Sequence, residues 1–454
     1  MSKSITISAK IERAFLIGVH PKYQSKEEYE YSMSELHQLS ETAGIEVVET
    51  FVQALERRDN ATLVGKGKLE EINSQIEINN ITTLIFNDNL SPSQARNIAE
   101  KTKCNIVDRT ELILDIFAKH AQTAESKLQV ELAQLEYSYS KLRHLWHHFS
   151  RIAGGSAVGV RGPGETQIEI DRRLVRNRIS MLKEKLENIK KTTETKRKKR
   201  ANQISICLVG YTNAGKSTLF NVLTKESIYT ADKLFATLDS TTRAFQCIVS
   251  NNEDANDSYS SSSHESLMLT DTIGFIENLP PTLIQSFYST LHEVREADLL
   301  LHVVDINNPK KEDHIETVDK ILKEIKADDK DVILVFNKCD TFYSLMDKFQ
   351  KKDLKNSYVD CIFISAKTGE NLDDLKKCVK KYLSHRKTKK KFIIPAIAEN
   401  IVSFLHNYTD IQSIDYVQEE HIYVCETLID RKLIKNVEEQ IEKSNLQILL
   451  EKED

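Results

Sequence analysis

The segment 210–218, Gly-Tyr-Thr-Asn-Ala-Gly-Lys-Ser-Thr, has the residue types and spacing of a phosphate-binding loop. It follows the apolar run 204–209 and precedes the apolar positions of a helix, which is the context that such a loop requires. We expect its backbone amides to face a β-phosphate at the N-terminus of that helix. Lys216 then reaches the β- and γ-phosphate oxygens, and the Ser217 hydroxyl ligates Mg²⁺. The alternative is a glycine turn before an ordinary helix.

Two further motifs predict which base the nucleotide carries. Asn337-Lys338-Cys339-Asp340 follows the apolar run 332–336, and Ser365-Ala366-Lys367 follows the run 361–364. Both motifs should lie at the carboxyl ends of parallel strands, where open α/β sheets bind ligands. An ionised Asp340 can accept hydrogen bonds from guanine N1–H and the 2-amino group, and adenine lacks both donors, so the sequence predicts GTP or GDP. Asn337 should fix the loop, Lys338 should cover the base plane, and the Ala366 amide should bind the guanine carbonyl oxygen.

Two segments between these motifs have the residues of a two-state switch. In Asp271-Thr272-Ile273-Gly274, Asp271 should hold a magnesium-bound water and the Gly274 amide should sense the γ-phosphate. In Phe235-Ala236-Thr237-Leu238-Asp239, Thr237 is a candidate second magnesium ligand in a loop that closes on the γ-phosphate. The alternative for Thr237 is an ordinary loop threonine.

Phe275 stands where many GTPases place a glutamine that orients the attacking water. A phenyl ring can neither donate nor accept the hydrogen bonds that this task requires. We therefore expect slow hydrolysis by the isolated chain and completion of the site by a partner. The alternative is that Phe275 packs under the switch while another residue of this chain orients the water.

The composition bounds the class of protein. A chain of 454 residues is long enough for about three domains. No apolar run approaches the ~18 residues that span a bilayer, and the N-terminus lacks the apolar segment of a secretory signal, so we expect a cytoplasmic protein without a membrane span. The seven cysteines include no Cys-x-x-Cys pair, which indicates reduced thiols and no zinc site.

The net charge of −5 conceals a strongly basic block. Residues 172–200 contain thirteen Lys and Arg against three Glu, so this block carries +10 and the rest of the chain −15. Such a block beside a phosphate-loop domain is typical of a nucleic-acid contact, and the alternative is a solvated helix face.

The hydrophobic pattern predicts an α/β protein in four parts. An N-terminal α/β domain (1–120) precedes a long, basic antiparallel helical hairpin (121–200) with a glycine-rich tip loop. A phosphate-loop GTPase domain (203–385) and a small C-terminal α/β domain (392–454) follow. The hairpin is predicted from two stripes of apolar residues at steps of three and four: Leu128, Leu132, Leu135, Tyr139, Leu142 and Trp146, then Val175, Ile179, Leu182, Leu186 and Ile189.

Individual elements can also be placed from the sequence. In the N-terminal part we expect strands at 14–19, 47–48, 83–86 and 105–107 and helices near 27–42, 67–78 and 91–102. Residues 250–266 are a polar insertion after a strand at 245–249, and 386–391 is a basic connector. In the C-terminal part we expect helices at 396–406 and 430–443 and strands at 414–417 and 422–426.

Six segments together resemble the HflX GTPases of the Obg-HflX group, and the resemblance covers nearly the whole chain. The run from Arg161 to Arg173, which contains Arg-Gly-Pro-Gly-Glu-Thr-Gln and Asp-Arg-Arg, is more specific than the general GTPase motifs. The segments are 65–68, 129–135, 161–167, 171–173, 210–218 and 235–239.

The resemblance implies a cytoplasmic GTPase that binds the large ribosomal subunit and its RNA and separates stalled or idle ribosomes. It also implies ATP hydrolysis or RNA unwinding by the N-terminal half, although residues 1–200 contain no complete ATP motif. In similar GTPases the position of Asn213 helps to hold K⁺ against the phosphates; the alternative is an asparagine that only stabilises the loop. A GTP-dependent ribosome-assembly or RNA-modification factor is the alternative function.

The expected site residues fall into four groups, and the protein is expected to be a monomer. The catalytic residues are Asn213, Lys216, Thr237 and Gly274, and the magnesium ligands are Ser217, Thr237 and, through water, Asp271. The RNA contacts are Arg161, Arg172, Arg173, Arg176 and Arg178. The GTP contacts are Gly210, Tyr211, Thr212, Asn213, Ala214, Gly215, Lys216, Ser217, Thr218, Phe235, Ala236, Thr237, Leu238, Asp239, Asp271, Thr272, Ile273, Gly274, Asn337, Lys338, Asp340, Ser365, Ala366 and Lys367.

Overall fold

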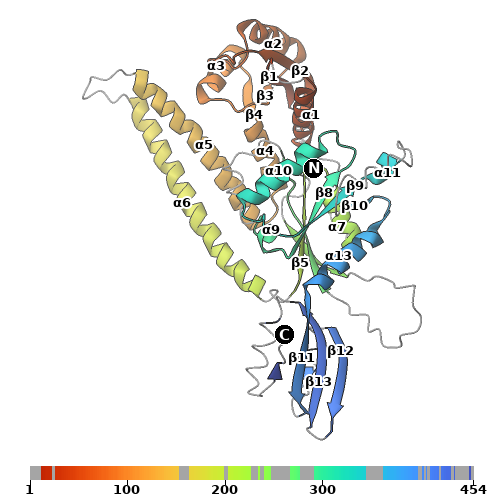
Figure 1. Ribbon diagram of the computed structural model, residues 1–454. Coiled ribbons are helices and arrows are strands. Elements are labelled where there is room, and N and C mark those ends of the chain that lie inside the picture. The colour runs from red at the N-terminus through yellow and green to blue at the C-terminus, as the bar shows by residue number, and fades with distance from the viewer. Residues whose placement is uncertain are drawn as a thin grey trace, which may run out of the picture.

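In the residues that it describes, the computed structural model contains three β-sheets and a long helical hairpin (Figure 1). It describes residues 12–22, 26–152, 163–198, 203–225, 234–235, 240–246, 266–276, 291–343, 361–396, 401–402, 405, 410–418, 421–430, 434 and 449–450. In this part of the chain no helix is both long and apolar enough to cross a membrane.

The N-terminal sheet is parallel, with strand order β2-β1-β3-β4. Its strands are β1 (Arg13–Pro21), β2 (Glu46–Leu55), β3 (Thr83–Phe86) and β4 (Asn105–Asp108). Helices α2 (Lys66–Asn79) and α3 (Pro92–Thr102) pack on the face that carries Phe15 and Phe86. Helices α1 (Lys26–Thr42) and α4 (Arg109–His120) pack on the other face. The strands and the first three helices were predicted, whereas α4 was not.

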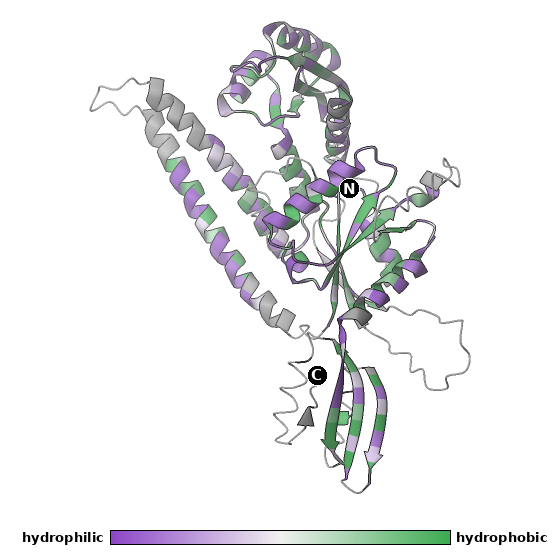
Figure 2. Cartoon of the chain, in the orientation of Figure 1, coloured by the Kyte–Doolittle hydropathy of each residue, from purple (hydrophilic) through white to green (hydrophobic). Residues whose placement is uncertain are grey.

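The hairpin consists of α5 (Ala124–Ile152) and α6 (Pro163–Lys198), which run side by side in opposite directions (Figure 1). The predicted stripes meet, because Leu132 of α5 is buried with Leu182 and Leu186 of α6. Figure 2 shows that the described part of α6 is otherwise mostly hydrophilic. The tip loop at 153–162, which includes Arg161, lies outside the described residues.

The predicted GTPase domain is built on a sheet whose described strands have the order β10-β9-β8-β5-β7-β6, and among these strands only β6 is antiparallel. The strands are β5 (Ser205–Val209), β6 (Thr241–Gln246), β7 (Ser266–Asp271), β8 (Leu299–Asp305), β9 (Val332–Asn337) and β10 (Cys361–Phe363). Strand β6 begins at Thr241 because it pairs with the full length of β7, so the predicted start at 245 was too late. The predicted polar insertion lies outside the described residues except for Ser266.

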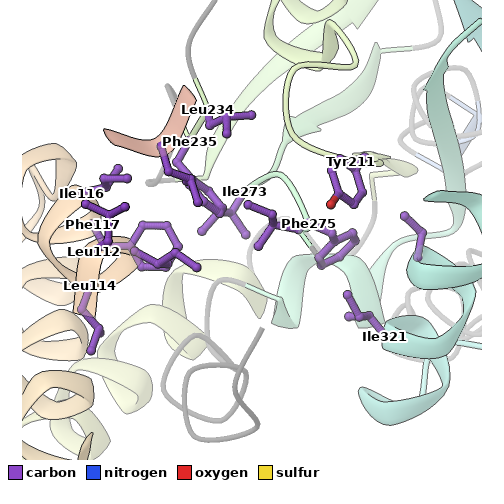
Figure 3. Close-up of a cluster of buried hydrophobic side chains, with 14 of the residues drawn as sticks. Leu112, Leu114, Ile116, Phe117, Tyr211, Leu234, Phe235, Ile273, Phe275 and Ile321 are labelled. Carbon is purple, nitrogen blue, oxygen red and sulfur yellow. The ribbon is translucent and has the colours of Figure 1, made fainter. Parts of the chain in front are cut away.

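Helices cover both faces of this sheet. Helices α7 (Lys216–Thr224) and α13 (Leu372–Arg386) pack on one face, and α9 (His292–Glu296) and α10 (Lys311–Glu324) pack on the other. The short helix α11 (Cys339–Tyr343) follows β9. The face with α9 and α10 shares one continuous hydrophobic cluster with α1 and α4, so the N-terminal domain is packed against the GTPase domain (Figure 3).

The C-terminal sheet is antiparallel and has the order β12-β13-β11-β14. Its strands are β11 (Lys387–Pro395), β12 (Asp410–Val417), β13 (Ile422–Asp430) and β14 (Leu449–Leu450). The prediction of a connector at 386–391 was wrong, because Arg386 closes α13 and the lysines that follow begin β11. Their backbone pairs with β13, and Phe392 and Ile394 anchor the strand in the core. Of the two predicted C-terminal helices, the structure describes residues 396, 401, 402, 405, 430 and 434; residues 401, 402, 405 and 434 are α-helical, whereas Asp430 ends β13, so the predicted start of the second helix at 430 was too early.

Candidate nucleotide site

The phosphate loop joins β5 to α7 at the carboxyl edge of the sheet. Gly215 has φ of +92°, and a side chain there would lie 2.2 Å from Nδ2 of Asn337, so only glycine fits this turn. The Nδ2 group of Asn337 donates to the Ala214 carbonyl at 2.9 Å, and its Oδ1 accepts from the Ala366 amide at 2.9 Å. Asn337 therefore ties the phosphate loop to the segment 365–367.

The buried Lys216 lies at the centre of this loop. Its Nζ atom donates to the carbonyl oxygens of Gly210 at 3.0 Å and Tyr211 at 2.7 Å. Burial lowers the pKa of Lys216 to about 8. A bound phosphate would restore a counter-charge at this amine and favour its charged form.

The residues expected to hold magnesium meet beside Lys216. The Ser217 hydroxyl donates to Oδ2 of the buried Asp271 at 2.6 Å. Mg²⁺ prefers oxygen ligands, and here a hydroxyl oxygen from α7 lies next to a carboxylate oxygen from β7. Ser217 and Asp271 therefore fit a magnesium site. The third expected ligand, Thr237, and its neighbours Ala236, Leu238 and Asp239 lie outside the described residues.

The segment 271–276 is paired directly with the phosphate loop. The Thr212 amide donates to the Phe275 carbonyl at 2.8 Å, and the Phe275 amide donates to the Gly210 carbonyl at 3.1 Å. A side chain at Gly274 would lie 2.8 Å from Cα of Thr212 and 3.0 Å from Nζ of Lys216. Gly274 therefore lies close to both Thr212 and Lys216, and a residue with a side chain would not fit at this position.

The expected base-binding residues lie on neighbouring strand ends. The Ser365 hydroxyl donates to Oδ1 of Asp340 at 2.7 Å, which orients this carboxylate. Lys338 forms an ion pair with Asp305 at 2.8 Å. The Thr272 hydroxyl donates to the Leu208 carbonyl at 2.6 Å and so holds its segment on the sheet. The structure thus brings 210–218, 271–274, 337–340 and 365–367 together at one edge.

Tyr211 has a role that sequence reasoning missed. Its hydroxyl donates to Glu35 of α1 at 2.6 Å, and its ring stacks on His314 of α10 with centroids 3.6 Å apart. Glu35 also forms a buried ion pair with Arg109 of α4, and Tyr31 of α1 contacts Nε2 of His314 at 3.0 Å. The Tyr211 side chain therefore connects the phosphate loop to the N-terminal domain.

The segment expected to switch also touches the N-terminal domain. Phe235 is 2% exposed and packs edge-on against Phe117 of α4, with centroids 4.6 Å apart. Phe275 is also 2% exposed and lies in the same cluster as Ile273 (Figure 3). In this structure the phenyl ring of Phe275 is a core side chain.

Three of the arginines expected to contact RNA link the two helices of the hairpin. Arg176 donates to the Tyr139 hydroxyl at 2.7 Å, Arg172 lies over the same ring, and Arg178 pairs with Glu131 at 2.6 Å. These three arginines join α6 to α5. Arg173 is exposed.

A phosphate loop at the carboxyl edge of a mostly parallel sheet, followed by the guanine motifs on the next strand ends, defines a P-loop GTPase. Three family models match the chain: "GTP-binding GTPase N-terminal" at 30–118, "GTP-binding GTPase Middle Region" at 120–200 and "50S ribosome-binding GTPase" at 205–338. Similar proteins named GTPase HflX occur in Flavobacterium psychrophilum (44% identity; 81% of this chain, 89% of the relative) and Escherichia coli (38%; 82% and 83%). The chain belongs to the HflX family, and it is a GTP-hydrolysing enzyme.

Among solved structures, the chain is similar to a GTP-binding protein from Sulfolobus solfataricus in complex with GDP. The two chains are 27% identical, the TM-score is 0.42, and the match covers 82% of this chain and 98% of that one.

The position of Asp340 leads to a test of base recognition. Asp340→Asn should weaken GTP binding and favour xanthosine triphosphate, because xanthine carries an oxygen where guanine carries the 2-amino group. The Ser365 hydroxyl can still donate to the new amide oxygen, so the loop should keep its shape. Competition binding with both nucleotides measures the change, and an unaltered preference for GTP would exclude Asp340 from base recognition.

Two buried histidines near the phosphate loop predict a pH dependence of stability. Burial lowers the pKa of His302 to about 3 and that of His314 to about 4, both below the ordinary value of 6.5. Below pH 6.5 these two histidines bind protons in the unfolded chain but stay neutral in the folded chain. The free energy of unfolding should therefore fall as the pH drops toward 4.

The comparison that isolates this effect uses denaturant titrations at pH 7 and pH 5. His302→Gln should reduce the loss of stability between the two pH values. An equal loss in the wild type and His302→Gln would contradict the assignment.

Proposed function

We propose that this GTPase binds the large ribosomal subunit through its basic hairpin and dissociates stalled or idle ribosomes in the cytoplasm. The family description "50S ribosome-binding GTPase" and the +10 charge of residues 172–200 support this proposal. The nucleotide groups at 210–218, 271–274, 337–340 and 365–367 hold GTP, with Ser217, Asp271 and Thr237 around Mg²⁺. Asn213, at the rim of the same site, holds K⁺ against the phosphates.

One series of contacts supports a link between RNA binding and the nucleotide. In the hairpin, Tyr137 donates to Asp108 at 2.6 Å and Lys141 pairs with Glu111 at 2.6 Å, so α5 is fixed to the start of α4. Phe117, on the same helix α4, packs against Phe235 beside the expected magnesium ligand Thr237. The single observation that carries the proposal is this Phe117–Phe235 contact. Closure of the loop on GTP would move Phe235 and would thus change the orientation of the hairpin.

Large ribosomal subunits should stimulate hydrolysis, because Phe275 cannot orient the attacking water and the bound subunit completes the site by supplying or positioning the group that does. Groups that complete a GTPase site raise the rate by about 10³ to 10⁵. Single-turnover hydrolysis with and without purified subunits measures the effect. Fast hydrolysis by the chain alone, unchanged by subunits, would contradict ribosome-triggered turnover.

A matched pair of variants assigns the stimulation to the hairpin. Arg173→Glu with Lys185→Glu reverses two exposed charges on α6 and should weaken stimulation about tenfold or more at moderate salt. Lys320→Glu with Lys323→Glu makes the same charge change on α10 and should have no such effect. Equal stimulation of both double variants would remove the hairpin from the proposed interface.

A further inference from the structure

The water-orienting group of this GTPase has to come from a residue other than Phe275. Its ring is buried in the hydrophobic cluster, and both its backbone amide and its backbone carbonyl form hydrogen bonds with the phosphate loop. Bringing this ring out of the core would expose apolar surface and would still supply no hydrogen-bonding group.

A cavity of about 200 Å³ is lined by Thr212, Asn213 and Ala214 of the phosphate loop. Thr212 connects this cavity to the expected position of the γ-phosphate, because a Cβ added at Gly274 would lie 2.8 Å from Cα of Thr212, which also lines the cavity. Within the described part of the chain, neither the Thr212 hydroxyl nor Nε2 of the buried His302, which lines the same cavity, has a hydrogen-bond partner. Such polar atoms are normally satisfied by water, so the cavity suits a small number of ordered waters.

Helix α1 also lines this cavity. Tyr31, Ser34, Glu35 and Gln38 line it at spacings of three and four residues. Glu35 is already bonded to Tyr211 and Arg109, and Tyr31 is bonded to His314. No hydrogen bond of the Gln38 side-chain amide is formed to any residue that the structure describes.

Gln38 has the chemistry that Phe275 lacks. A glutamine amide accepts through its carbonyl oxygen and donates through its NH₂ group, so it can contact a water and a phosphate oxygen at once. Ser34 reaches less far into the cavity because its side chain is three heavy atoms shorter than that of glutamine. The hydrogen bond from Tyr211 to Glu35 attaches α1 to the phosphate loop, and Gln38 lies on the next turn of α1.

We propose that Gln38 of α1 supplies, in cis, the amide that orients the attacking water. The amide oxygen accepts a hydrogen bond from the water, and the amide N–H donates to a γ-phosphate oxygen. The water oxygen forms the new bond to phosphorus while the bond from phosphorus to the β–γ bridging oxygen breaks. The proton of the water passes to the released phosphate and GDP leaves, so Gln38 keeps all its atoms.

The test compares variants of the full-length chain in single-turnover hydrolysis without ribosomes. Gln38→Ala should lower the rate constant about 100-fold, the magnitude typical for loss of one oriented group in an active site. Gln38→Glu keeps the acceptor but loses the donor and adds a negative charge near the phosphate, so it should be at least as slow. His37→Ala, on the next residue of the same helix, should hydrolyse GTP like the wild type.

Two further measurements separate a catalytic role from a structural one. Affinity for a fluorescent, non-hydrolysable GTP analogue and the thermal midpoint should be the same in Gln38→Ala and the wild type. A lower affinity or midpoint that accounts for the lost rate, or an unchanged rate, would overturn the proposal.

A final experiment repeats the hydrolysis measurement with large ribosomal subunits and therefore rests on the proposed function. Gln38→Ala should remain slower than the wild type at saturating subunits, since the subunit would then act by positioning α1. Recovery of the full wild-type rate would show that the subunit supplies the group itself and would overturn the proposal. Absence of any stimulation of the wild type would refute the ribosomal function alone, because the comparison of isolated chains still tests Gln38.

Discussion

The structure depends on one buried set of polar contacts between the phosphate loop and the N-terminal domain. Tyr211 donates to Glu35, and Glu35 is paired with Arg109, whose side chain is only 5% exposed. Removing one partner of a buried ion pair typically costs about 3–5 kcal/mol, because the other charge stays unpaired in the interior. The ion pair between Glu35 and Arg109 is therefore maintained, and the hydrogen bond to Glu35 keeps Tyr211 next to it. The position of the phosphate loop and the position of α1 are consequently set together.

Hydrophobic packing extends this constraint to the segments expected to respond to the γ-phosphate. Phe235 packs on Phe117, and Ile273 and Phe275 share the same cluster (Figure 3). Interfaces of this kind have a few discrete arrangements and do not deform continuously, because side chains in a core are close-packed. A phosphate that displaces Gly274 must therefore either break this packing or carry α4, and with it the hairpin, to a new position.

The sequence predicted which segments meet at the candidate site, because each of them is a short motif that follows the end of a strand. The Ser217–Asp271 and Ser365–Asp340 contacts join residues that the motifs had already singled out. Tyr211 was expected only to contact the nucleotide, since nothing in the spacing of α1 shows that Glu35 lies opposite it. The lysines at 387–391 looked like a connector because charge dominates their pattern, whereas pairing with β13 decides their structure. Long-range pairing of this kind cannot be obtained from local periodicity.

We infer that the nucleotide state and the N-terminal domain are coupled through Tyr211. The most direct test is amide hydrogen exchange of α1 and α4 in the isolated protein, with GDP and with a non-hydrolysable GTP analogue. Exchange in both helices should differ between the two nucleotides, and Tyr211→Phe, which lacks the hydroxyl that bonds Glu35, should reduce the difference. Identical exchange of α1 and α4 with both nucleotides would contradict the coupling.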